Sequence, residues 1–118
     1  MIEVEIDVLL EKMNGFTKMD KSEIQAIKER IKELERVDGD EEIRRALAEN
    51  ERRTLISLLN RIASKRLTKL VNSAVHEMIF EERIIDLSNA MEFEKQFYES
   101  LLVLMRNYWK NWEVDGDE

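Results

Sequence analysis

The chain contains no cysteine and no proline, and only three of its 118 residues are glycine. The absence of cysteine excludes disulfide bonds and thiolate metal sites. Proline stops helices, so its absence favours long uninterrupted ones. No apolar run approaches the ~20 residues that a membrane-spanning helix needs, and the acidic start of the chain is unlike a signal peptide. We therefore expect a cytoplasmic protein without membrane contact.

Residue sets that carry chemistry are also scarce. His76 is the only histidine, so no His/Cys zinc site can form within one chain. Ser73 precedes it at helical spacing but has no evident orienting acid or oxyanion hole. Nucleotide-binding glycine motifs are absent. Some carboxylates could hold Mg²⁺, although acidic clusters at this density are more often solvated helix faces; these are Glu81, Glu82 and Asp86, and Glu92 with Glu94. We expect no catalytic residues, no metal, no cofactor and no enzymatic activity.

Charge is plentiful and unevenly spread. Charged residues make up 38% of the chain and the net charge is −7, against about 25% charged residues in an ordinary domain. Residues 44–69 hold eight basic and two acidic groups, a net +6, whereas residues 1–43 carry −6 and residues 70–118 carry −7. The middle of the chain is a basic island in an acidic protein.

Part of the island has a regular spacing. Arg61, Lys65 and Lys69 stand four residues apart, which forms one stripe on a helix. One interpretation is contact with nucleic-acid phosphates. The other is ion pairing with the acidic helices on either side, within the chain or across a subunit boundary, which the balance of charge favours. The candidate interaction residues of the island are Arg52, Arg53, Arg61, Lys65, Arg66 and Lys69.

The first part of the chain gives one ambiguous and one clear pattern. Residues 2–8 alternate between apolar and acidic side chains, which is typical of a strand, but the apolar positions around Leu9 also fit a helix. We expect a short extended piece that runs into a helical turn ending at Asn14-Gly15. A helix over residues 21–37 follows, capped at Asp20 or Ser22 and ended by residues 38–40.

The middle of the chain predicts one very long central helix. Nothing interrupts a helix from Glu41 to about Phe80, a length of up to ~40 residues against a mean of about 12. Two helices with a bend near Asn50 or Asn60 are the alternative. A helix this long overhangs a domain of this size, so we expect its exposed parts to rest on partners or on another copy of the chain.

Residues 81–90 read as a connection, with Ser88 as the cap of a last helix. That helix presents an apolar stripe which includes Phe97, Tyr108 and Trp112, and we expect these side chains in the core. Tyr98 and Trp109 fall off the stripe and are either core residues or interface anchors.

These patterns predict an all-α fold: a small helical bundle with one very long central helix and a possible short N-terminal strand. Residues 1–113 form a single helical domain, and residues 114–118 are an acidic frayed tail or a truncated linker. The expected core consists of Ile24, Ile27, Ile31, Leu34, Leu58, Leu59, Ile62, Leu70, Phe93, Phe97, Leu101 and Tyr108.

Two stretches, residues 55–74 and 87–108, resemble the helical domain of GINS subunits, the archaeal and eukaryotic DNA replication factors. The long helix of that family is matched by Arg61, Lys65, Arg66, Leu67, Lys69 and Leu70, and its aromatic helix by Glu94, Phe97, Tyr98, Leu101, Leu102 and Tyr108. The family usually carries a small β-rich second domain, so a truncated chain and a divergent single-domain member both stay open.

The resemblance implies a non-enzymatic scaffold. GINS complexes are four-subunit assemblies built largely through helical domains, and they join the replicative MCM helicase to a RecJ/Cdc-type partner and to primase or polymerase. We expect an interaction subunit of such a complex, contacting other protein subunits through helical faces, and located at the nucleoid if the source is archaeal. The alternatives are a helical nucleic-acid-binding module and a homo-oligomeric adaptor or regulatory protein.

Overall fold

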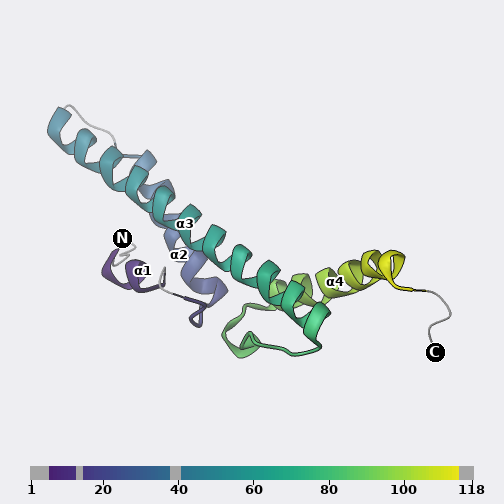
Figure 1. The fold of residues 1–118 in the computed structure, drawn as a ribbon. Helices are drawn as coiled ribbons and strands as arrows, with labels where there is room; N and C mark the ends of the chain where they lie inside the picture. The colour runs from purple at the N-terminus through teal and green to yellow at the C-terminus, as the bar shows by residue number, and fades with distance from the viewer. Residues whose placement is uncertain (1–5, 13–14, 38–40, 115–118) are drawn as a thin grey trace.

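A computed structural model of the chain describes residues 6–12, 15–37 and 41–114, and these form an all-α fold (Figure 1). No strand occurs among them, which confirms the predicted fold class. The helices are α1 (Ile6–Lys12), α2 (Lys21–Glu35), α3 (Glu42–Phe80) and α4 (Glu92–Trp109), with the short 3₁₀ helices η1 (Leu87–Asn89) and η2 (Lys110–Trp112) on either side of α4.

The N-terminal segment is helical where it is described, so the predicted strand is wrong for residues 6–8. Helix α1 buries Leu9 against α2 and α3, whereas the neighbouring Val8 and Leu10 are exposed. Burial of one apolar position per turn is the helical alternative to the period-two pattern. Residues 1–5 and Asn14 lie outside the described residues. Gly15 has φ +119°, a backbone conformation that favours glycine.

Helix α2 follows its predicted pattern. Asp20 is its N-cap, and its backbone N–H donates to the carboxylate of Glu23 at 3.0 Å, as in a capping box. Ile27 and Leu34 are buried, and the predicted core residues Ile24 and Ile31 are half-buried against the same cluster. The helix ends at Glu35, with Arg36 as its C-cap, two residues before the predicted end at residue 37; residues 38–40 lie outside the described part of the chain.

Helix α3 runs through both predicted bend sites, Asn50 and Asn60, as one helix of 39 residues. At 1.5 Å per residue it is about 58 Å long, and it sets the dimensions of the molecule, 75 × 23 × 19 Å. The radius of gyration is 19.8 Å, against about 13.5 Å for a compact chain of this length. The helix ends where Glu81 adopts a left-handed conformation with φ 55°.

Two small cores lie along this rod rather than one. Helices α1 and α2 pack on the N-terminal half of α3 around Leu55, Leu58 and Ile62. Helix α4 packs on the C-terminal half, and Figure 1 shows it continuing beyond the end of α3. This second core is formed by Leu70, Ala74, Ile85, Tyr98 and Leu102.

The predicted core is confirmed on α3, but on α4 it is confirmed only for Leu101, which packs against the second core. Leu58, Ile62 and Leu70 are buried, and Leu59 and Leu101 are half-buried. The other expected core residues of this part of the chain are exposed instead, by 51% for Phe93, 38% for Phe97, 61% for Tyr108 and 70% for Trp112.

Helix α4 is turned relative to the expectation, so that Glu94, Tyr98 and Leu102 face α3. It begins after Met91, so the predicted cap at Ser88 is also wrong. The hydroxyl and backbone N–H of Ser88 both donate to Asp86, which caps η1.

Candidate protein interaction surface

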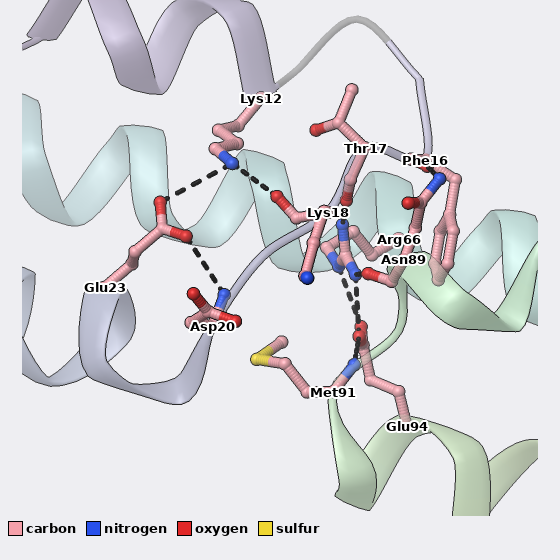
Figure 2. Close-up of polar contacts among 10 residues, drawn as sticks. All are labelled: Lys12, Phe16, Thr17, Lys18, Asp20, Glu23, Arg66, Asn89, Met91 and Glu94. Carbon is pink, nitrogen blue, oxygen red and sulfur yellow. Dashed lines mark hydrogen bonds and ion pairs between the residues drawn. The ribbon is translucent and has the colours of Figure 1, made fainter.

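A buried ion pair fixes the start of α4 against the middle of α3. The guanidinium of Arg66 donates two parallel hydrogen bonds to the carboxylate of Glu94, at 2.7 and 2.8 Å (Figure 2). Side-chain exposure is 3% for Arg66 and 7% for Glu94. Glu94 also accepts a hydrogen bond of 2.9 Å from the backbone N–H of Met91, at the N-terminus of α4. One carboxylate therefore both caps α4 and ties it to α3.

Arg66 also holds the two loops that approach this junction. It donates to the carbonyls of Thr17 at 2.6 Å and Asn89 at 3.0 Å, and it lies 4.2 Å from the ring centre of Phe16 (Figure 2). Since its nitrogens are bonded inside the protein, Arg66 is not available to phosphates, and its place among the candidate interaction residues is wrong. Both carboxylate oxygens of Glu94 likewise accept hydrogen bonds from Arg66, so they are not free to bind a metal ion.

A second buried polar group joins the far part of α4 to α3. The hydroxyl of Tyr98, which is 0% exposed, donates to Glu77 at 2.8 Å. Arg83 donates to both carboxylate oxygens of Glu77, at 2.7 and 3.1 Å, and this lowers the pKa of the Glu77 carboxyl. Burial, together with the bond to Glu77, raises the pKa of Tyr98 to about 12. Tyr98 is thus a core residue and not an interface anchor.

Because Glu94 and Tyr98 face α3, the apolar stripe of α4 lies on the flank of the helix, about 90° around its axis from Tyr98. We call this stripe, together with its rim, the α4 face. Tyr108 and Trp112 close one end of it, with their ring centres 6.4 Å apart. The stripe consists of Phe93, Phe97, Leu101, Leu104, Tyr108 and Trp112, of which all but the half-buried Leu101 are exposed.

The rim of the α4 face is uncharged, and it is polar except for Val103. At 100° per residue, the side chains on one flank of the stripe are Gln96, Ser100, Val103, Asn107 and Asn111. The charged residues of this part of the chain lie on the opposite side; they are Glu92, Lys95, Glu99, Arg106 and Lys110. In a protein with 38% charged residues, a charge-free arc six helical turns long is unusual.

An apolar groove continues the α4 face onto α3. Its volume is about 290 Å³, and it lies where α2 and α4 leave the middle of α3 uncovered. Leu67, 51% exposed, forms one wall, and Phe93 and Phe97 form the other. Arg66 and Glu94 contribute the polar groups of its lining. No prediction from the sequence identified this groove, because it depends on how α4 lies across α3.

The remaining basic residues divide into paired and unpaired ones. Arg52 and Arg53 both bind Glu49, at 2.9 and 3.0 Å, and Arg52 also lies 3.6 Å from Glu35 of α2. Glu49 lies on α3 within the basic island, so the predicted ion pairing with the neighbouring acidic helices accounts only for the contact of Arg52 with Glu35. It does not account for Arg61, Lys65 and Lys69, which we call the basic stripe: all three are exposed and form no ion pair with any described residue.

The other candidate residues from the sequence, which are Trp109, His76 and Ser73, do not come together in one site. Trp109 is 40% exposed beside Arg83 and Arg106 near the end of α3. His76 lies 3.5 Å from Glu82, and Ser73 is buried. Over the described ranges, no cluster of three or more histidine and carboxylate side chains could hold a metal ion.

Comparisons with protein families, with curated proteins and with solved structures found no match to this chain. Within residues 6–12, 15–37 and 41–114, no helix is long and apolar enough to span a membrane. The α4 face and its groove are therefore the candidate site, because they expose apolar and aromatic side chains without charge.

Proposed function

We propose that this protein is a non-enzymatic interaction subunit that binds other protein subunits through the α4 face and the groove. The observation that carries this is an exposed, charge-free aromatic surface on a heavily charged chain. Contiguous apolar patches with a polar rim mark protein contacts, and aromatic residues dominate the binding energy of such contacts. The length of the molecule, 75 Å, suits a connector that touches partners at separate points.

The assembly is a DNA replication complex of the GINS type, associated with the replicative helicase in the cytoplasm, and at the nucleoid if the source is archaeal. The resemblance of residues 55–74 and 87–108 to GINS helical domains supports this. Several residues that carry the resemblance, Arg66, Glu94 and Tyr98 among them, are those that join α3 to α4. If this chain and GINS subunits share a pair of packed helices, the same residues would both carry the resemblance and join the two helices.

Binding to the purified MCM-type helicase of the source organism tests the proposal. Tyr108 and Trp112 are 61% and 70% exposed, so changing both to serine should preserve the fold and weaken binding at least about tenfold. The matched control is Ile43→Ser with Leu47→Ser, at 76% and 65% exposure on the other end of the molecule. Equal loss in both double variants, or none in the first, contradicts a role for the α4 face.

A nucleic-acid-binding module is the second candidate, and the unpaired basic stripe favours it. Three cations at intervals of four residues repel one another. Binding of an anionic partner would relieve this electrostatic repulsion, which no ion pair with a described residue offsets. Binding through Lys65 and Lys69 should be salt-dependent, and changing both to alanine should reduce the log–log salt slope by about 2. Absence of binding to single- or double-stranded DNA at low salt rules out this candidate.

A further inference from the structure

The apolar positions of the α4 face have a palindromic spacing. From Phe93 to Trp112 the steps along the chain are 4, 4, 3, 4 and 4 residues, which read the same from either end. The centre of the pattern lies between Leu101 and Leu104, with two aromatic residues beyond each of them. A spacing that reads the same in both directions is what a helix face needs in order to pair with an antiparallel copy of itself.

Such a spacing matches a second α4 lying antiparallel across the first. In a two-fold interface, residue i contacts residue j and j contacts i. With the axis at the centre of the pattern, Phe97 of each copy lies opposite Tyr108 of the other, and Leu101 lies opposite Leu104. Phe93 then faces Trp112 at both ends. Every apolar residue of the face finds an apolar counterpart at the same height.

Charge also favours self-association through this surface. Each copy carries a net charge of −7, so two copies repel one another wherever charged faces meet. The α4 face and its rim hold no charged residue. It is therefore a surface on which a second copy can dock without bringing like charges into contact, whereas the basic stripe of α3 lies elsewhere.

The exposed area is of the size that a stable dimer needs. Aromatic side chains offer 150–250 Å² each, so at the observed exposures the four aromatic residues of the face present about 440 Å². That is more than half of the ~800 Å² that each partner contributes to a standard interface. Leu67 and Leu104, which are 51% and 67% exposed, and the rim add to it.

The position of α4 leaves room for such a partner. Its C-terminal half projects past the end of α3, away from α1 and α2 (Figure 1). An antiparallel second copy brings its own projecting aromatic end back over Phe93 and Phe97 of the first. These two side chains form a wall of the groove, so the aromatic end of each copy covers the groove of the other.

We infer that the α4 face and the groove are covered by a second copy of this chain, in a two-fold dimer whose α4 helices pair antiparallel about Leu101 and Leu104. This inference rests on the proposed function. It names the partner that covers the interaction surface, which is a second copy of the chain.

Mass measurement by sedimentation equilibrium tests the dimer. At about 100 µM, where even weak micromolar pairs associate, the full chain should show twice its mass of 14.1 kDa. Leu104→Glu places two charges at the centre of the interface and should raise the dissociation constant at least about 100-fold. Leu47→Glu makes the same change at matched exposure (65% against 67%) outside the interface and should leave the mass unchanged. Circular dichroism confirms that both variants fold.

Cysteine cross-linking tests the antiparallel register, and the chain has no cysteine of its own to interfere. A mixture of Phe97→Cys and Tyr108→Cys proteins should cross-link efficiently with a short thiol reagent. Either variant alone should not, because its two cysteines would lie about 16 Å apart along the helix axis. Cross-linking of Phe97→Cys to itself, with no gain in the mixture, indicates parallel pairing and overturns the inference.

The outcomes separate this inference from the proposed function. A monomer at every concentration that still binds the helicase through the α4 face refutes the dimer and upholds the interaction subunit. A dimer with the stated cross-links that binds no replication protein upholds the inference and refutes the replication assignment. A monomer that binds no protein refutes both.

Discussion

Removal of Arg66 should cost this protein a large share of its stability. Arg66→Met abolishes both bonds to Glu94, the bonds to the carbonyls of Thr17 and Asn89, and the contact with Phe16. The methionine fills much of the same volume. It leaves the buried carboxylate of Glu94 with the single N–H of Met91 as a donor.

The magnitude follows from the burial of the pair. Breaking a buried ion pair by removing one partner costs about 3–5 kcal/mol, because the remaining charge is uncompensated. Whole domains are stable by only about 5–15 kcal/mol. Replacement of both partners by Met removes the stranded charge, so the double variant should lose only about 1–2 kcal/mol, much of it from the lost cap of α4.

Urea unfolding followed by circular dichroism measures these differences. With a slope of about 2 kcal/mol/M, the Arg66→Met midpoint should fall by about 2 M. Arg61→Met is the matched control, since Arg61 lies on the same helix but is exposed and unpaired, and its effect should stay within about 0.5 kcal/mol. All midpoints are compared at one protein concentration, because association would shift them. A loss below about 1 kcal/mol in Arg66→Met, or a double variant as unstable as the sum of the single ones, would refute this reasoning.

Four further outcomes follow from the contacts. The Arg83 guanidinium holds the pKa of Glu77 below its ordinary value, so Glu77 stabilises the fold above about pH 4.5 and loses this effect as the pH falls; Glu77→Gln should flatten the acid limb of the stability curve. Tyr98 has its pKa raised to about 12, so stability should fall between about pH 10 and pH 12. Tyr98→Phe should remove that alkaline loss and cost about 1 kcal/mol at pH 7 in urea unfolding. Ile62→Ala, at 1% exposure, should cost about 2–5 kcal/mol. Lys65→Gln should stabilise the chain by about 0.4–1 kcal/mol at low salt by relieving repulsion from Arg61 and Lys69, and the gain should vanish in 1 M salt, where the Debye length is about 3 Å.

The sequence was sufficient to predict α2 and α3, because their signals are local. Asp20 and Glu23 form a cap within four residues, and Ile27 and Leu34 repeat at helical spacing on one face. The uninterrupted helix over residues 42–80 follows from the absence of proline and of internal glycine. Over residues 6–8 the local signal was misleading, since the apolar residues there also suit a helix that, within Ile6–Lys12, buries Leu9 alone.

The orientation of α4 could not be predicted, because its apolar arc is about twice as wide as the face it buries. Phe97 and Leu101 lie in one half of that arc, and Tyr98 and Leu102 in the other. Hydrophobicity favours the first half, which is more apolar. The second half is buried because Glu94 and Tyr98 find partners on α3, which are 28 and 21 residues away in the sequence. The signal that was present but missed is the charge-free flank of Gln96, Ser100 and Asn107.

The same division of α4 couples stability to association. The core under α4 is small: among the described residues it holds five buried apolar side chains, against nine in the core around α2. Much of its cohesion comes from the hydrogen bonds of Glu94 and Tyr98 to α3. A larger apolar surface on the same helix faces outward. A partner that covers this surface binds only the folded form, so it stabilises the C-terminal half by a free energy that rises with the logarithm of its concentration over its dissociation constant. The hydrogen bonds of Glu94 and Tyr98 thus orient α4 so that its most apolar half is available for assembly, and assembly in turn supplies the apolar burial that the second core lacks.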